Sequence, residues 1–210
     1  PMLVITLSSL LGLVWLGQQP RDDLGVASFN VAPEVWVPYV PSDDILESTW
    51  FCPGVPATGE TDVGGAVIVT NTSDQPTSAR VTFLSDTAAA RTKIVDVPAF
   101  DRVQVDVDAE QQGTFVATSV EILGGGGLVE QRAFYPASAG LGQSVTPCSI
   151  NLSSEWYLAE GYTVDLAEQM LLLSNPSADQ VVVDVSFHTA SGTIEPSMYN
   201  GLPVQPYSVR

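Results

Sequence analysis

An internal repeat limits the folds open to this 210-residue chain more than any other feature of its sequence. The segment 66–73 aligns without a gap with the segment 170–177, about 104 residues later. Each segment begins with an apolar run and ends in a turn around an asparagine, Asn71 in the first and Asn175 in the second. A pattern that recurs at one offset predicts a tandem array of one structural module.

The aromatic residues that precede each segment belong to the same repeat. Trp50 and Phe51 come before the first segment, and Trp156 and Tyr157 come before the second. Because these four residues take equivalent places in the two copies, packing in a core is their simplest interpretation. Exposed aromatic platforms for sugar rings are the alternative.

Short alternating patterns predict strands through most of the chain after residue 48. Val103, Val105 and Val107 alternate with polar residues, which is the period of a half-buried strand. Further strand patterns occur at 64–70, 78–84, 92–97, 114–123, 128–135, 169–174 and 181–187. Short strands separated by turns are typical of sandwiches and barrels. We therefore predict an all-β protein with two tandem immunoglobulin-like β-sandwich modules.

The repeat divides this β region into a first module at 48–147 and a second at 148–210. The first copy continues through three more strand patterns after Pro98, whereas the second copy ends at Arg210, about 30 residues short of that length. We expect the second module to be incomplete. Its open sheet edge would be covered by a partner strand or by further residues of a longer chain.

An uncharged apolar segment precedes the modules. As a helix, residues 2–16 would span about 22 Å, against about 30 Å of bilayer hydrocarbon. That length suits the core of a signal peptide, but no small-residue cleavage site follows it. We predict a signal anchor at 1–19, with a cleaved signal peptide or a buried helix as alternatives. Residues 20–47 are rich in Pro and Asp and predict a linker that can add one edge strand.

The charge of the chain excludes one class of partner. It has 24 acidic and 7 basic residues, for a net charge of -17. Such a surface repels phosphate backbones, so we expect no nucleic-acid partner. We interpret the acidity as a source of solubility, and the capture of Ca²⁺ by clustered carboxylates is the alternative.

The two cysteines, Cys52 and Cys148, predict one disulfide if the chain is exported to an oxidising compartment. The bond would join the two ends of the first module. A catalytic or metal-binding thiol is the alternative, but a nucleophilic cysteine needs a base, and the single histidine, His188, is distant in sequence.

Other candidate sites have simpler interpretations. His188 falls on the polar side of its strand and is expected to be exposed, and one histidine cannot build a His-rich zinc site. Gly124 to Gly127 are followed by a strand pattern rather than by Gly-Lys-Ser/Thr, so they predict a hairpin turn instead of a phosphate-binding loop. Glu160 is expected to stabilise a turn. We predict no catalytic, cofactor or metal-binding residue.

The second copy carries a recognisable motif. Residues 156–163 (WYLAEGYT) and 171–176 (LLLSNP) resemble a repeat of an uncharacterised actinobacterial family of secreted and membrane-anchored proteins. The resemblance covers about 160 residues, from 48 to the end, and implies a β-sandwich domain outside the membrane and no particular activity. The first copy has Cys52-Pro53-Gly54 in place of Ala-Glu-Gly, which is consistent with a disulfide there.

Three functional hypotheses follow. The first is a non-enzymatic, extracytoplasmic cell-envelope protein, membrane-anchored or secreted, with a structural or adhesive role and an envelope protein or glycan as its partner. The second is a module that binds cell-wall glycan through its aromatic residues. The third and weakest is a glycoside hydrolase with two acidic residues, which no sequence spacing would reveal.

Overall fold

The computed structural model describes residues 46–210 except 61, 125, 136–141, 160 and 162–168. The chain divides into two compact units, 1–37 and 38–210, and all described residues belong to the second. The predicted helix at 1–19 and nearly all of the predicted linker at 20–47 therefore lie outside the described residues, as does Glu160. In the part that is described, no helix combines the length and the apolar character needed to cross a membrane.

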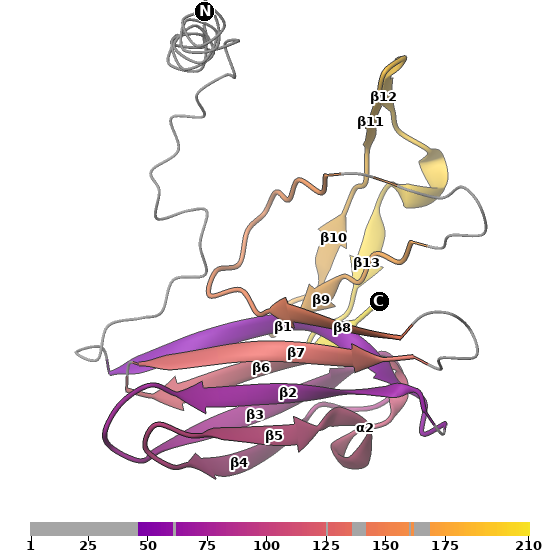
Figure 1. Ribbon diagram of the computed structural model, residues 1–210. Coiled ribbons are helices and arrows are strands. Elements are labelled where there is room, and N and C mark those ends of the chain that lie inside the picture. The colour runs from indigo at the N-terminus through magenta and orange to yellow at the C-terminus, as the bar shows by residue number, and fades with distance from the viewer. Residues whose placement is uncertain (1–45, 61, 125, 136–141, 160, 162–168) are drawn as a thin grey trace, which may run out of the picture. The chain divides into compact units, whose positions relative to one another are not determined.

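Two four-stranded antiparallel sheets pack face to face and form the N-terminal sandwich, which confirms the predicted all-β sandwich fold (Figure 1). The first sheet, in the order β1-β6-β3-β4, contains β1 (Glu47–Ala57), β6 (Gly113–Leu123), β3 (Thr77–Ser85) and β4 (Arg91–Val97). The second sheet, in the order β5-β2-β7-β8, contains β5 (Arg102–Asp106), β2 (Gly64–Asn71), β7 (Gly127–Phe134) and β8 (Gln143–Pro147).

The strand order differs from that of an immunoglobulin constant domain. There the first two strands are neighbours in one sheet. Here β1 pairs with β6, and β2 lies in the opposite sheet. The sandwich thus shares the two-sheet architecture of that domain with a different connectivity. The order also changes the role of Gly124–Gly127, because β6 and β7 lie in opposite sheets, so this segment is not a hairpin turn.

The core lies between the two sheets and is built from the alternate residues of their strands. In β7, for example, buried and partly exposed positions alternate through all eight residues. The largest fully buried side chains include Trp50, Phe83 and Ile122. Val107 is also fully buried, although β5 ends one residue before it and Val107 begins the short helix α2 (Val107–Glu110). The prediction of Val107 as a strand residue is therefore wrong, whereas its inward orientation is correct.

The residues after the sandwich form three small two-stranded sheets. The pairs are β9 (Ser174–Asn175) with β14 (Ser208–Val209), β10 (Val181–Val183) with β13 (Leu202–Val204), and β11 (Phe187–Thr189) with β12 (Gly192–Ile194). A 3-10 helix, Ser197–Tyr199, lies between β12 and β13. These strands are shorter than the sequence predicted at 169–174 and 181–187, and each of them has a neighbour on only one side among the described residues.

The strand register shows which elements correspond in the two copies. Val181 lies opposite Val204 in the β10–β13 pair, as Thr77 lies opposite Val97 in the β3–β4 pair. In the same way, Ser174 lies opposite Val209 in the β9–β14 pair, as Thr70 lies opposite Arg102 in the β2–β5 pair. The strands β9 and β14 therefore take the places of β2 and β5. Within the described residues, the C-terminal copy has no counterpart of β6 or β7.

A small apolar cluster joins the two copies. Leu172 and Val209 of the C-terminal copy pack with Leu84, Ala117 and Phe115 of the sandwich. Leu172 alternates with Leu171 and Leu173, so the side chains of those two neighbours point to the opposite face of their segment.

Candidate functional site

The disulfide predicted between Cys52 and Cys148 is present, with the two Cα atoms 4.6 Å apart. Both cysteines are buried. Cys52 lies in β1 of the first sheet, and Cys148 directly follows β8 of the second, so the bond joins the two sheets at one edge of the sandwich. Next to it, Phe51 and Ser149 exchange two backbone hydrogen bonds, at 2.7 and 2.9 Å. The arrangement is structural, and neither sulfur is free for thiol chemistry.

The turn after β2 is built around the side chain of Asn71. Its Nδ2 donates to the carbonyl oxygens of Gln75, Val97 and Pro98, at 2.7, 3.3 and 3.1 Å. Its Oδ1 accepts from the backbone N–H and the hydroxyl of Ser73, at 2.9 and 2.8 Å. The buried amide thus ties the end of β2 to the end of β4.

Asn175 repeats this arrangement in the C-terminal copy. Its Nδ2 donates to the carbonyl oxygens of Asp179, Val204 and Gln205, at 2.8, 3.3 and 3.1 Å. Its Oδ1 accepts from the backbone N–H and the hydroxyl of Ser177, at 3.0 and 2.6 Å. The two asparagines lie in the same structural environment.

A strained aromatic residue accompanies each turn. Phe100 and Tyr207 both have φ of 51°, which is uncommon for a residue with a side chain. The N–H of Phe100 donates to the carbonyl of Ser73 at 3.0 Å, and that of Tyr207 donates to the carbonyl of Ser177 at 3.1 Å. The duplication therefore extends to backbone detail.

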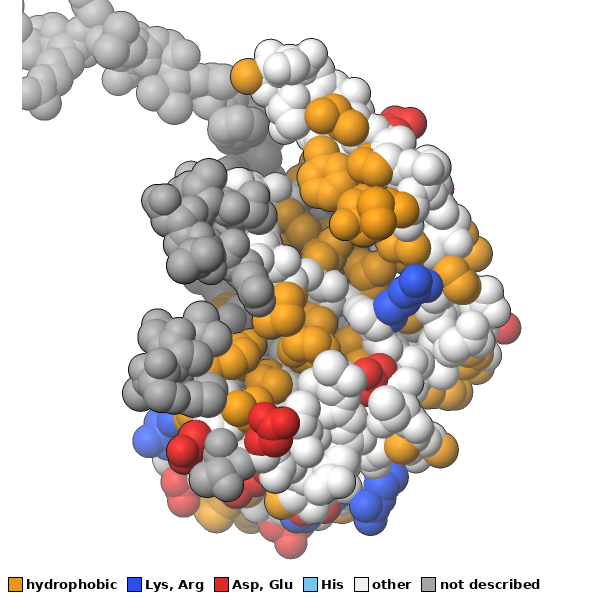
Figure 2. Space-filling view, turned by 90° about the vertical axis from the view of Figure 1, so that its right-hand side faces the viewer, with side chains coloured by type: hydrophobic (Ala, Val, Ile, Leu, Met, Phe, Trp, Pro, Cys, Tyr) orange, Lys and Arg blue, Asp and Glu red, His pale blue; other side chains and the backbone are white. Residues whose placement is uncertain are grey.

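Burial is where the two copies differ. We call five side chains of the C-terminal copy the open face: Leu171, Leu173, Val183, Val185 and Phe187. Their counterparts in the sandwich, at the offset of about 104 residues, are core residues exposed by 1% or less: Val67, Val69, Ala79, Val81 and Phe83. On the open face, Leu171 and Phe187 are 44% and 45% exposed, and the other three are partly buried. Figure 2, a view onto the right-hand side of Figure 1, shows hydrophobic side chains gathered on that side of the molecule.

The aromatic pair of the C-terminal copy is also exposed. Trp50 is fully buried and Phe51 is partly buried, but Trp156 and Tyr157 are 61% and 79% exposed. Core packing is thus confirmed for Trp50 and wrong for Trp156 and Tyr157. The physical reason is that β1, which carries Trp50, pairs with β6 in its sheet. No strand takes the place of β6 in the described part of the C-terminal copy.

Polar contacts fix these exposed aromatic side chains. The indole N–H of Trp156 donates to the carbonyl of Ser153 at 3.0 Å. The hydroxyl of Tyr157 donates to a carboxylate oxygen of Glu155 at 2.7 Å. This hydrogen bond, together with the negative charge of Glu155, raises the pKa of Tyr157 above its ordinary value of 10.0.

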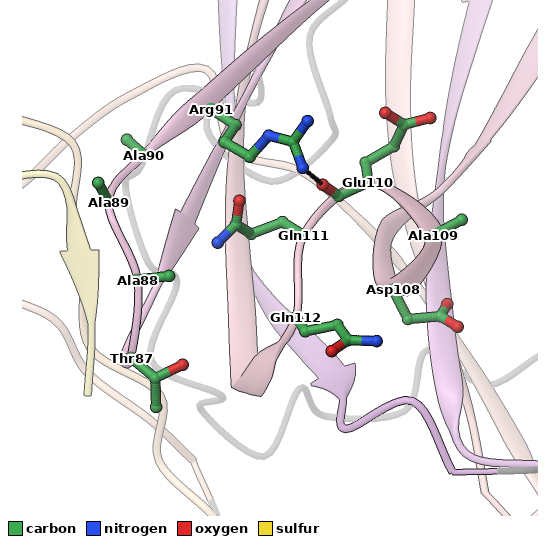
Figure 3. A pocket seen from close by; sticks show the side chains of 10 residues that line it. All are labelled: Thr87, Ala88, Ala89, Ala90, Arg91, Asp108, Ala109, Glu110, Gln111 and Gln112. Atoms are coloured by element: carbon green, nitrogen blue, oxygen red, sulfur yellow. Dashed lines mark hydrogen bonds between the residues drawn. The ribbon is translucent and has the colours of Figure 1, made fainter.

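An open hollow of about 660 Å³ lies between the β3–β4 connection and α2 (Figure 3). The short side chains of Ala88, Ala89 and Ala90 lie along one side of it (Figure 3). Arg91 follows these alanines, and its guanidinium donates to the carbonyl of Glu110 in α2 at 2.8 Å (Figure 3). The Glu110 carboxylate is held in an ion pair by Lys93. Asp108 and Glu110 are the two acidic residues in the lining of the hollow.

His188 is exposed, as its strand position predicted. Its Nδ1 lies 3.0 Å from the hydroxyl of Thr193, on the neighbouring strand of the β11–β12 hairpin. The residues with described positions contain no group of three or more His, Cys, Asp or Glu side chains able to hold a metal ion.

No family model matches the sequence, and no curated protein is similar to it. Among solved structures, the chain is similar to a protein of Thermotoga maritima, with a TM-score of 0.40 and 13% identity over 50% of this chain and 94% of the other. It is also similar to the sensory rhodopsin transducer of Anabaena, with a TM-score of 0.36 and 14% identity over 46% of this chain and 96% of the other. At these scores, neither similarity bears on the function of this chain.

Proposed function

We propose that this chain is a non-enzymatic, extracytoplasmic protein of the cell envelope, membrane-anchored or secreted, with a structural or adhesive role. In this role the C-terminal copy contacts other envelope components, and the N-terminal sandwich is the rigid support that carries it.

The disulfide supports the location. Disulfides form and persist in oxidising compartments and are rare in the cytosol. The Cys52–Cys148 bond is buried and joins the two sheets, and its presence is compatible with an extracytoplasmic location.

The open face is the observation that carries the proposed role. Its five apolar side chains have the sequence places of core residues, yet Leu171 and Phe187 are 44% and 45% exposed and the other three are only partly buried. Contiguous exposed apolar surface on a folded protein marks a site of interaction with other molecules. We therefore assign the contact function to this face.

Binding of the full chain to an envelope fraction of the organism that makes it tests this role. We expect binding that Phe187→Ser on the open face reduces at least fivefold. Val182→Ser is the matched control, because Val182 is also exposed but alternates with Val183 and so lies on the other side of β10. Equal binding of the two variants, or the absence of binding by the wild-type chain, would contradict the proposal.

The exposed pair Trp156 and Tyr157 favours a second candidate, the binding of cell-wall glycan. Large aromatic side chains with one polar atom suit surfaces that are part apolar and part hydrated. If this candidate holds, Trp156→Ala abolishes retention on purified cell-wall polysaccharide, while Phe187→Ser leaves it unchanged. Retention that does not change with Trp156→Ala would exclude it.

A further inference from the structure

We propose that the open face binds a strand–turn–strand segment of a partner polypeptide, whose two strands take the places that β6 and β7 take in the N-terminal sandwich. The proposal rests on the contact role proposed above and names the chemistry of the partner.

The N-terminal sandwich shows which strands cover such a face. In it, β2 lies between β5 and β7, and β3 lies between β4 and β6. In the C-terminal copy, β9 pairs with β14 and β10 pairs with β13, and no described strand pairs with the second edge of β9 or of β10. An unpaired edge presents backbone N–H and C=O groups that bind an added strand.

The connectivity of β6 and β7 defines the shape of the occupant. These two strands are consecutive in the chain and lie in opposite sheets, joined by the short segment 124–126. One continuous segment thus supplies a strand to each sheet and closes the core between them. The occupant of the open face needs the same shape, with one strand along β9, another along β10, and a turn that crosses between the two sheets.

The inward positions of β6 and β7 define its apolar pattern. Val116, Val120 and Ile122 of β6 and Val129 of β7 are fully buried against the residues that correspond to the open face. In β6, Val120 lies opposite Val81, whose counterpart on the open face is Val185. The occupant therefore carries branched apolar side chains at alternate positions of both strands.

The negative charge of Asp184 on the C-terminal copy limits which segments can bind the open face. In the sandwich, Arg80 of β3 lies opposite Glu121 of β6, and the two side chains form an ion pair at 2.5 Å. At the offset of the repeat, the place of Arg80 is taken by Asp184, an exposed carboxylate. One of its oxygens accepts from the N–H of Gly201 at 2.6 Å. A strand added here brings its residue opposite Asp184, and that residue is therefore Lys or Arg.

This charge also argues against a second copy of the chain as the occupant. The β6 strand of another copy would place Glu121 opposite Asp184, and like charges that face each other across two strands are destabilising. In addition, β6 is already paired on both sides within its own sheet, with β1 and β3. The segment that binds here is therefore not β6 of a second copy, and it carries a basic residue at this position.

Two peptides that differ at one position provide the test. The first has the sequence of residues 113–134 of this chain, and the second carries Glu121→Lys. Each is titrated into the full chain, with fluorescence anisotropy as the readout. We expect the Glu121→Lys peptide to bind about three- to tenfold more tightly than the unchanged peptide. In the Asp184→Lys variant of the protein, the preference is expected to reverse.

Hydrogen exchange shows where the peptide binds. We expect the Glu121→Lys peptide to slow exchange of the amides in β10, and Val182→Ser to leave its affinity unchanged. Equal affinity of the two peptides, a preference that does not reverse with Asp184→Lys, or unchanged exchange in β10 would overturn strand addition. If the full chain self-associates and Phe187→Ser removes this self-association, the argument against a second copy as the occupant is wrong.

The two proposals fail in different ways. If Phe187→Ser reduces binding to the envelope fraction but neither peptide binds, the contact role stands and strand addition is wrong. If the peptides bind as expected but the envelope fraction does not, the strand-binding chemistry stands and the envelope role is wrong.

Discussion

At the scale of single residues, two asparagines hold the two copies in the same local geometry. An amide group has two N–H donors, whereas the Nδ2 of Asn71 lies within 3.3 Å of three carbonyl oxygens, so one of its N–H groups is shared. Aspartate would lose these donors, and a smaller side chain would leave buried carbonyl groups without partners. This explains why an asparagine occupies the turn in both copies.

Replacement of Asn71 by Ala is expected to destabilise the sandwich by about 2–4 kcal/mol, since several buried hydrogen bonds are lost together. Urea denaturation followed by Trp fluorescence measures the change. Asn175→Ala is the matched control, because the same hydrogen bonds are lost outside the sandwich core, and we expect it to lower the global stability by less than half as much. Equal losses in the two variants would show that the copies unfold as one unit.

The two repeat tryptophans provide a second comparison. Trp50 is fully buried, so Trp50→Ala is expected to cost about 3–5 kcal/mol. Trp156→Ala, at the exposed counterpart, is expected to change stability by less than about 0.5 kcal/mol. Thermal unfolding of the two variants tests this, and a comparable loss from Trp156→Ala would show that its side chain is buried in solution.

At the scale of elements, β1 contains an irregularity that the sequence did not reveal. Its register with β6 shifts between Cys52 and Val55, and Gly54 has φ of 143°, in a region that favours glycine. The side-chain amide of Gln131 satisfies the backbone there, with its oxygen accepting from the N–H of Gly54 and its nitrogen donating to the carbonyl, both at 3.1 Å. The bulge is thus stabilised from the opposite sheet.

Gly54→Ala is expected to destabilise the protein by about 1–3 kcal/mol through backbone strain. A Cβ at this position would also lie 3.2 Å from the Leu172 side chain, which packs against the sandwich. Gly124→Ala is the control, since φ is 88° at Gly124 and a Cβ would meet no atom within 4 Å. We expect chemical denaturation to give the larger loss for Gly54→Ala; the opposite order would contradict the packing of Leu172 on β1.

Most strands of the sandwich could be predicted from the sequence because they alternate between core and solvent. The predicted bounds of β2, β3, β4, β6 and β7 each lie within one residue of those observed. In contrast, all five residues of β8 are exposed, so this strand has no apolar periodicity that would reveal it. The patterns at 169–174 and 181–187 predicted longer strands than those observed, because periodicity shows which side chains prefer a core and not whether neighbouring strands are present.

At the scale of the whole molecule, the disulfide connects the two ends of the sandwich across 96 residues of sequence. Its pairing followed from a count of two cysteines, whereas the strand order of the two sheets did not follow from the sequence. The pairing of β1 with β6 depends on contacts between residues far apart in the chain, and local sequence patterns do not reveal such contacts. For the same reason, the exposure of the open face emerged only from the structure.

Removal of the disulfide by Cys52→Ser with Cys148→Ser is expected to lower the stability of the sandwich by about 4–5 kcal/mol, since a long loop in the unfolded chain is no longer closed. Denaturation of the double variant, compared with the wild-type chain under oxidising and reducing conditions, measures this. A loss below about 1 kcal/mol, or a wild-type chain that reducing agent leaves unchanged, would contradict the structural role of the bond.

Residue-resolved hydrogen exchange of the full chain tests most directly whether the C-terminal copy lacks the strands that close the core of the N-terminal sandwich. Strands paired on both sides around a closed core exchange slowly, whereas strands with one free edge open locally. We predict that amides of β2 and β3 exchange at least about a hundredfold more slowly than their counterparts in β9 and β10. Equal protection in corresponding strands would contradict the account, because it would require the open face to be covered in the free protein.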